Sequence, residues 1–242
     1  MTAEDPETRD RLTRDLWLVQ RAKGHRFSSD DLVTALIATR AVPDATRILD
    51  LGCGIGTVLL HLAWTHRAAT LVGIEAQAIS FALLERNVAA SGFADRVAIH
   101  HGDLREVAVG TGYDLVTGTP PYFPVGTSVG ALDEQRAYAR IEYRGGVEAY
   151  LAAGARALAP GGTLVVCGDA RANARVEAAA GELAITARCD VIPRLGEPAL
   201  FAVWTLRRGV PPIVSTITTM TLRDAAGAPT SDAAALRAFS GL

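Results

Sequence analysis

Short apolar runs alternate with longer amphipathic stretches through the middle of the chain. The short runs are rich in β-branched residues and have the length of strands, and they cover 45–51, 70–76, 96–103, 113–119 and 162–169. Apolar residues at helical spacing lie between them, over 56–67, 78–92 and 146–162. This alternation predicts an α/β fold with a mostly parallel sheet and helices on both faces.

The pattern changes towards the C-terminus. Residues 182–192 and 198–208 alternate between apolar and polar positions and are separated by a short loop. They are expected to form an antiparallel hairpin at the edge of the sheet, which brings the expected strand count to seven. We expect one domain over 1–242, with a helical extension over 1–43 that forms part of the pocket, a core over 44–208, and a tail over 209–242 that packs on the core.

Composition narrows the class of protein. The chain has 242 residues, 49% of them hydrophobic and 21% charged, and its formal net charge is −2, which excludes a disordered or low-complexity chain. Lys23 is the only lysine, so 23 of the 24 basic residues (24 − 1) are arginine. A net charge this close to zero argues against a surface that is positive throughout, and leaves room for a local basic patch on a nucleic-acid binder.

Cysteine usage and the N-terminus indicate a cytoplasmic protein. The three cysteines are widely spaced and form neither a disulfide framework nor a zinc motif, so we expect no metal. No apolar run reaches the length of a membrane span, and the first residues do not resemble a secretory signal. The oligomeric state is left open.

A glycine-rich turn follows the first apolar run. Asp50 precedes three glycines in a G-x-G-x-G pattern, Gly52, Gly54 and Gly56. Glycines at this place allow a tight turn and let a ligand lie against bare backbone. The spacing differs from the dinucleotide fingerprint, and Asp50 would repel a phosphate while attracting an ammonium group. A nucleoside without phosphates and with a cationic amino-acid end, S-adenosylmethionine, fits this turn.

Acidic residues end the next two apolar runs. Glu75 lies 19 residues past Gly56 (75 − 56), where a carboxylate can accept both ribose hydroxyls of a nucleoside. Asp103 ends the following run. Because the carboxyl ends of parallel strands meet at one edge of the sheet, these acids and Asp50 are expected beside one crevice.

The fourth run is followed by Thr119-Pro120-Pro121-Tyr122-Phe123. Two prolines fix φ and expose a carbonyl oxygen that no neighbouring N–H group claims. The aromatic residues supply a face for a planar group. The combination favours a loop that orients a nitrogen lone pair towards an electrophile.

Together these segments resemble the class I S-adenosylmethionine-dependent methyltransferases, which have a Rossmann-like fold, and within them the amino-methylating type with an Asn/Asp/Ser-Pro-Pro-Tyr/Phe motif. The chain is most similar to the bacterial tRNA(Val) adenine-N6 methyltransferases. Residues 24–33, Arg86-Asn87, residues 139–142 and residues 221–227 extend this similarity over most of the chain.

The resemblance implies roles for individual residues. It places the cofactor, S-adenosyl-L-methionine, against Asp50, Gly52, Gly54, Gly56, Glu75, Ala76, Asp103, Leu104 and Thr119. It implies direct methyl transfer to a nitrogen, with the acceptor oriented by Thr119, the Pro120 carbonyl and Tyr122. The substrate would then be bound by Phe27, Tyr122, Phe123, Arg140 and Glu142, of which the last two equally suit a surface salt bridge.

One position departs from the family pattern. Thr119 stands where the family has Asn, whose amide offers an acceptor and a donor in one plane, whereas threonine has only a short hydroxyl. Three hypotheses therefore remain. The chain methylates adenine N6 in tRNA, it methylates a small planar metabolite or a protein side chain, or it binds the cofactor without catalysis as a scaffold.

Overall fold

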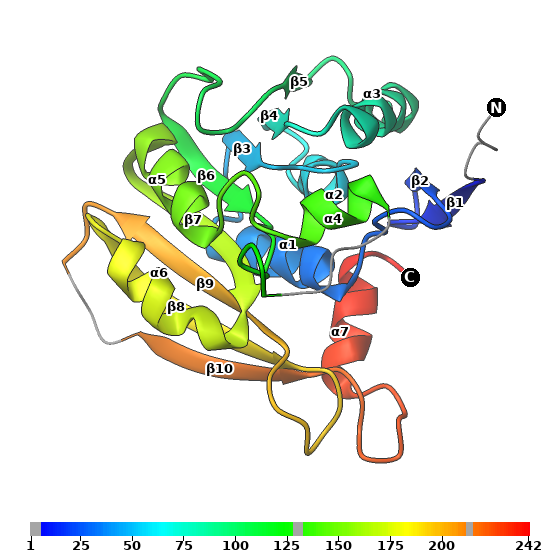
Figure 1. Cartoon of the computed structure of the whole chain (residues 1–242), viewed down its shortest axis with the longest axis vertical. Coiled ribbons are helices and arrows are strands. Elements are labelled where there is room, and N and C mark those ends of the chain that lie inside the picture. The colour runs from blue at the N-terminus through cyan, green and yellow to red at the C-terminus, as the bar shows by residue number, and fades with distance from the viewer. Residues whose placement is uncertain (1–5, 128–132, 212–214) are drawn as a thin grey trace.

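The computed structural model describes residues 6–127, 133–211 and 215–242. Its centre is a mixed sheet of eight strands in the order β10-β8-β9-β7-β6-β3-β4-β5 (Figure 1). Their bounds are β3 (Arg47–Leu51), β4 (Thr70–Glu75), β5 (Val97–His101), β6 (Tyr113–Gly118), β7 (Leu158–Asp169), β8 (Leu183–Ile192), β9 (Phe201–Arg208) and β10 (Thr216–Thr221). The five apolar runs of the sequence are thus strands β3 to β7, and they are parallel to one another.

Helices cover both faces of the sheet, as predicted. One face is packed by α1 (Ser29–Ala41), α2 (Thr57–Thr65), α3 (Ala78–Ser91) and α7 (Ser231–Phe239), and the other by α5 (Val147–Ala157) and α6 (Asn173–Ala179). Neighbouring residues of one strand serve opposite faces, since Ile48 packs with the first group of helices and Leu49 with the second. Burial on both sides explains why the runs are apolar almost throughout. A short helix, α4 (Glu134–Arg140), and a 3₁₀ turn, η1 (Ala170–Ala172), complete the helices of the described residues.

The sheet has one strand more than the seven expected. β10 pairs in parallel with β8, in register from Thr216 opposite Ala187, so the segment 209–242 does more than pack on the core as a tail. Its sequence is rich in threonine, and only Met220 of β10 is buried, so the strand lacks an apolar signal. The expected hairpin of β8 and β9 is present, but β9 lies between β7 and β8, and β10 takes the edge position.

The N-terminal segment also differs from the expected helical extension. Before α1, the chain forms an antiparallel hairpin of β1 (Glu7–Arg11) and β2 (Trp17–Arg21). The hairpin alternates in burial: Leu18 and Gln20 are turned inward, whereas Trp17 is exposed. The Asn87 side chain ties β2 to α3, since it accepts from the Val19 N–H at 2.8 Å and donates to the Val19 carbonyl at 3.1 Å. A hairpin therefore leads the chain into the segment that borders the pocket.

Candidate cofactor and methyl-acceptor pocket

The glycine-rich turn joins β3 to α2, and its three glycines have left-handed backbones. Their φ angles are +60° at Gly52, +57° at Gly54 and +96° at Gly56. A side chain at Gly52 would also collide with Tyr150, because a Cβ there would lie 2.1 Å from the phenolic oxygen. At Gly54, by contrast, no heavy atom lies within 4 Å of the Cβ position. Gly54 thus keeps an open backbone face beside the pocket.

Glu75 at the end of β4 is bound to this turn. One oxygen of its carboxylate accepts the Gly54 N–H at 2.9 Å, and the other accepts the Gln77 N–H at 2.7 Å. Burial raises the pKa of Glu75, and these backbone hydrogen bonds act in the opposite direction. A carboxylate has about four lone-pair positions, so Glu75 retains acceptor capacity for further donors.

Asp103 and Asp50 have different surroundings. Asp103 accepts from the guanidinium of Arg105 at 2.9 and 2.6 Å, and these hydrogen bonds lower its pKa. Asp50 is 1% exposed, and one of its oxygens accepts from the Thr117 hydroxyl at 2.7 Å. Its second oxygen has no hydrogen-bond partner among the described residues. Burial raises the pKa of Asp50 to about 7.

These elements border one pocket. Of the residues expected to bind cofactor or substrate, the pocket walls contain Phe27, Gly52, Gly54, Glu75, Ala76, Asp103, Leu104 and Thr119. The carboxyl ends of three neighbouring strands therefore do meet at one crevice, with Thr119 facing the same space. Asp50 and Gly56 lie beside it but do not line it in the described part of the chain.

The Pro-Pro loop after β6 brings only part of the expected acceptor site, Thr119, Pro120 and Tyr122, to the pocket. Thr119 and Pro121 line the pocket, whereas Pro120 is buried. The hydroxyl of Tyr122 donates to Asp30 at 2.9 Å and lies 3.2 Å from the Cys167 sulfur, and the ring packs against the core. Burial raises the pKa of Tyr122 well above its ordinary value. A stacking position for Tyr122 in the pocket is therefore not present in this structure.

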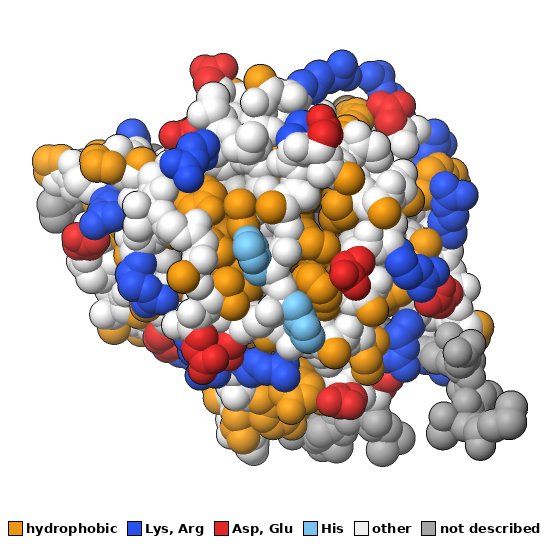
Figure 2. Space-filling view, turned by 90° about the horizontal axis from the view of Figure 1, so that it is seen from above, with side chains coloured by type: hydrophobic (Ala, Val, Ile, Leu, Met, Phe, Trp, Pro, Cys, Tyr) orange, Lys and Arg blue, Asp and Glu red, His pale blue; other side chains and the backbone are white. Residues whose placement is uncertain are grey.

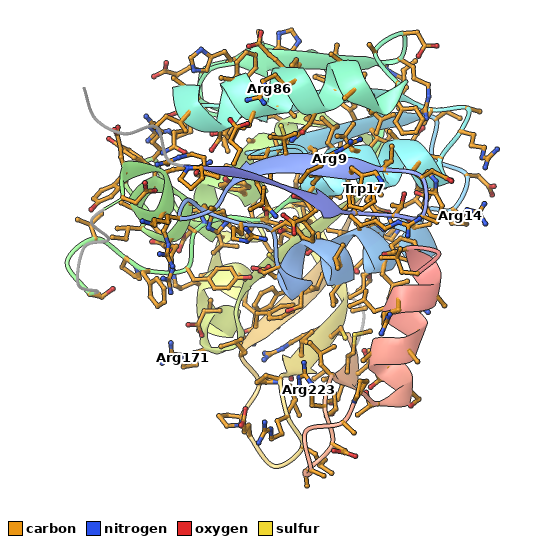
Figure 3. All side chains as sticks on the ribbon, turned by 90° about the vertical axis from the view of Figure 1, so that its right-hand side faces the viewer. Arg9, Arg14, Trp17, Arg86, Arg171 and Arg223 are labelled. Carbon is orange, nitrogen blue, oxygen red and sulfur yellow. The ribbon has the colours of Figure 1, made fainter. Side chains whose placement is uncertain are left out.

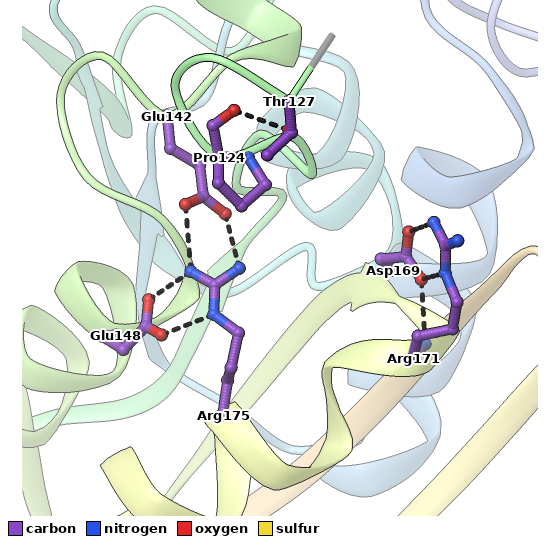
Figure 4. A network of polar contacts seen from close by, with 7 residues as sticks. All are labelled: Pro124, Thr127, Glu142, Glu148, Asp169, Arg171 and Arg175. Atoms are coloured by element: carbon purple, nitrogen blue, oxygen red, sulfur yellow. Dashed lines mark hydrogen bonds and ion pairs between the residues drawn. The ribbon is translucent and has the colours of Figure 1, made fainter.

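The expected substrate contacts of Phe123, Arg140 and Glu142 are not brought to the pocket either. The Arg140 guanidinium carbon lies 5.5 Å from the centre of the Phe123 ring, and neither residue lines the pocket. Glu142 accepts two hydrogen bonds from Arg175, at 2.9 and 3.0 Å, and Arg175 also binds Glu148 (Figure 4). The sequence left Glu142 as either a substrate contact or part of a salt bridge, and the structure contains the salt bridge. This ion pair joins the segment after α4 to α6.

Several pocket residues were missed from the sequence. They come from segments without a chemical motif, and they include His25, Asp31, Gln135, Tyr138, Arg144 and Tyr150. Gln135 is fully buried, and its side chain accepts from the His25 N–H at 3.2 Å and donates to the Ser80 hydroxyl at 3.1 Å. α4 is thereby held over the pocket. His25 and Asp31 lie in the family-like segment 24–33, whereas the sequence carried no signal for Gln135, Tyr138, Arg144 and Tyr150.

The outside of the molecule carries mixed charge. On the face that Figure 2 shows, Lys/Arg and Asp/Glu side chains surround a centre of hydrophobic side chains, with histidine side chains among them. Among the described residues, there is no group of three or more His, Cys, Asp and Glu side chains that could hold a metal ion. No helix in the part of the chain described here is long and apolar enough to cross a membrane.

Comparison with known proteins assigns this pocket to a family. The model of the methyltransferase small domain matches residues 25–183, which include the glycine turn, both strand-end acids and the Pro-Pro loop. The chain belongs to the methyltransferase small domain family. The matched range begins at His25 in the pocket wall and ends at the first residue of β8, so the N-terminal hairpin and β10 lie outside it.

Relatives of this methyltransferase small domain protein have more specific names. A tRNA1(Val) (adenine(37)-N6)-methyltransferase of Porphyromonas gingivalis is 33% identical over 123 residues, which are 49% of this chain and 48% of the relative. A protein of the same name from Aeromonas hydrophila is 31% identical over 174 residues, 70% of this chain and 72% of the relative. The chain thus spans about half the length of the first relative and more of the second.

A solved structure shares the fold. The crystal structure of a predicted O-methyltransferase from Agrobacterium tumefaciens superposes with a TM-score of 0.65 at 19% identity, over 87% of this chain and 96% of that chain. The likeness confirms the α/β fold with helices on both faces of a central sheet.

Proposed function

We propose that this protein is an S-adenosylmethionine-dependent N-methyltransferase that methylates an exocyclic amino group, such as adenine N6, in tRNA. One observation carries the proposal: Thr119 of the Pro-Pro loop lines the same pocket as Gly54 and Glu75. A cofactor held by the glycine turn would therefore be within reach of an acceptor held by the loop. The names of the relatives support tRNA as the source of the acceptor.

The pocket residues fit the proposed cofactor. The open backbone face at Gly54 leaves room for a ligand, which a side chain would occupy. Glu75 has lone pairs left for the two ribose hydroxyls, and Asp103 provides a second carboxylate that can accept from the adenine amino group. Asp50 lies beside the turn with one carboxyl oxygen unpartnered among the described residues, and the ammonium group of the methionine end would favour the ionised form of this carboxyl.

The cofactor would supply a methyl group on a positively charged sulfur. This chain would position the acceptor nitrogen so that its lone pair points at that methyl carbon, and alignment of this kind is worth about 7–11 kcal/mol. The Thr119 hydroxyl can accept one hydrogen of the amine, and Phe27 supplies an apolar wall for a planar ring. Stacking by Tyr122 would require its hydroxyl to leave Asp30, which a bound substrate would have to compensate.

Thr119 favours a second candidate, because threonine lacks the planar fork of the family's Asn. In that case the same pocket methylates a small planar metabolite or a protein side chain. The cofactor residues are shared by both candidates, so only the acceptor distinguishes them.

Two experiments test the proposal. Isothermal titration calorimetry with S-adenosylhomocysteine is expected to show binding, and the absence of heat at high micromolar ligand in a folded sample would rule out the cofactor. Transfer of a labelled methyl group is then compared between total bacterial tRNA, a metabolite extract and a protein extract. Incorporation into tRNA supports the first candidate, and incorporation only into one of the other fractions establishes the second. Binding without transfer to any fraction would leave the protein a cofactor-binding scaffold.

A further inference from the structure

The outer face of the N-terminal hairpin carries an exposed tryptophan between arginines. Side chains on this face alternate with buried ones, and Arg11 lies directly opposite Trp17 in the strand register. Trp17 keeps 43% of its surface exposed. The guanidinium carbons of Arg9 and Arg11 lie 5.5 and 5.6 Å from the centre of its ring. Figure 3 shows Arg9 and Trp17 together on this side of the molecule.

The exposure of Trp17 does not come from a loosely attached hairpin. On the inner face, Leu18 and Gln20 are each 1% exposed, and Asn87 bonds both backbone groups of Val19. The hairpin is therefore a firm platform, and a large aromatic side chain on its outer face is held in water at a cost. What distinguishes Trp17 from other exposed apolar side chains is the two guanidinium groups beside its ring, which together with the ring form a face for a planar, negatively charged partner.

The arginines on this outer face are not neutralised by nearby acids in the described part of the chain. The acids of the hairpin are already paired: Glu7 with Arg86 at 2.7 Å, and Asp10 with Arg26 at 3.1 Å. Within residues 6–127, 133–211 and 215–242, no carboxylate lies within ion-pair distance of Arg9 or Arg11. The face thus presents uncompensated positive charge around an aromatic ring.

A further arginine and tryptophan lie at the end of the hairpin, where the arginine has an acidic partner: Arg14 is paired with Asp15 at 3.3 Å. Arg14 lies over the ring of Trp64 on α2, with its guanidinium carbon 5.8 Å from the ring centre. Trp64 is partly exposed, and its indole N–H donates to Asp15 at 2.9 Å. We call the five residues Arg9, Arg11, Arg14, Trp17 and Trp64 the hairpin platform.

We propose that the hairpin platform binds unpaired nucleotides of an RNA, with a base stacked on Trp17 and neighbouring phosphates bound by Arg9 and Arg11. The inference rests on the proposed function in so far as RNA is the methyl acceptor. Aromatic rings flanked by arginine suit this ligand because every base has a face to stack and every nucleotide carries a phosphate. Arg9 and Arg11, which have no carboxylate partner within the described residues, would also give a chain of net charge −2 a local positive site for a polyanion.

The position of the platform relative to the pocket fits a bound RNA. β2 runs from Trp17 to Arg21, a length of about 14 Å at the usual rise of a strand, and the chain then enters the pocket wall at His25 and Phe27. A nucleotide that is turned out into the pocket and others on the platform would therefore belong to one RNA loop. The platform would hold the RNA while the pocket receives the target base.

The test compares variants of the platform in the full chain. Affinity is measured by fluorescence anisotropy with a labelled anticodon stem-loop of tRNA(Val), and cofactor-site integrity by calorimetry with S-adenosylhomocysteine. We expect Trp17→Ala to raise the Kd for RNA about tenfold and Trp17→Phe to restore most of the affinity, because a phenyl ring still stacks. We expect Arg9→Ala/Arg11→Ala to weaken binding about as much and to reduce the slope of log K against log salt by about two.

A matched double variant controls for net charge. Arg171→Ala/Arg223→Ala removes two exposed arginines that lie far from the platform in Figure 3, and it should leave the RNA affinity and the salt slope near the wild-type values. Equal losses in both double variants, or no loss in Trp17→Ala, overturn the platform while methylation of tRNA by the wild type still stands. If the wild type neither binds nor methylates RNA but binds S-adenosylhomocysteine, both the platform and tRNA as substrate are refuted.

Discussion

The buried carboxyl of Asp50 makes a sharp prediction for the free protein. Asp50 is 1% exposed, has one hydrogen bond from Thr117, and leaves its other oxygen without a partner among the described residues. An ionised carboxylate in such a place is expensive, because burial removes water and one hydrogen bond does not replace it. Asp50→Asn keeps the shape and an acceptor for Thr117 while removing the charge. We therefore expect it to stabilise the free protein at neutral and alkaline pH.

The magnitude follows from the pKa of Asp50, which burial raises from 3.8 to about 7. Because the folded-state pKa is the higher one, the folded protein binds more protons than the unfolded chain between these values. The stability contributed by the neutral carboxyl is therefore complete below about pH 4 and is lost as the pH rises through 7. The difference between the folded and unfolded pKa values of Asp50 corresponds to about 4 kcal/mol of free energy of unfolding, and about 2.5 kcal/mol of this is lost between pH 5 and pH 8.

The assay is urea denaturation of the wild type and of Asp50→Asn, each at pH 5 and at pH 8. The advantage of the variant in free energy of unfolding should grow by about 2.5 kcal/mol from pH 5 to pH 8. Asp114→Asn is the matched control. Burial acts to raise the pKa of Asp114, but hydrogen bonds from Thr46 and Arg47 outweigh it and the net pKa is lowered, so this carboxylate stays ionised over the range. A difference between Asp50→Asn and the wild type that does not change with pH would refute the reasoning.

Three further predictions concern the pocket and its support. Gly54→Ala should weaken S-adenosylhomocysteine binding in calorimetry by at least tenfold, because the added methyl group enters the open backbone face. It should also destabilise the protein by about 1–2 kcal/mol, because φ at this position is +57°. Unchanged affinity would contradict the cofactor assignment. Arg175→Ala should lower the free energy of unfolding by about 1–3 kcal/mol, because it leaves the Glu142 side chain, which is 11% exposed, without its partner. The control is Glu148→Gln, which breaks the more exposed pair. If Arg175→Ala destabilises the protein no more than Glu148→Gln does, the prediction is contradicted. Thr119→Asn should raise methyl transfer to adenine at saturating cofactor about tenfold, because it restores a planar acceptor at that position. A lower rate at saturating cofactor would indicate a different acceptor.

Much of the pocket could be predicted because it is built from local units. Each strand is followed at once by its turn, and parallel strands with helical connections bring their carboxyl ends to one edge. Gly54, Glu75 and Thr119 are therefore placed by the order of elements alone, and all three line the pocket. The strands themselves were visible because burial on both faces leaves continuous apolar runs.

The remaining features depend on partners far away in the chain. Tyr122 carries no sign that its hydroxyl would bind Asp30, 92 residues earlier, and Glu142 carries none that it would bind Arg175. β10 and the hairpin of β1 and β2 were missed for a related reason. They lie at the periphery, where one face meets water and the apolar pattern is weak.

The α/β fold, the glycine turn and the acids at the strand ends could thus be read from the order of residues, because they follow from short-range periodicity and from the geometry of parallel strands. Which polar side chains are free to bind a ligand became visible only in the folded chain. Glu75 keeps acceptor capacity in the pocket, Glu142 is taken up by Arg175, and the guanidinium groups around Trp17 have no acidic partner among the described residues. The physical reason is that a side chain's availability depends on what the rest of the folded chain places within a few ångströms of it.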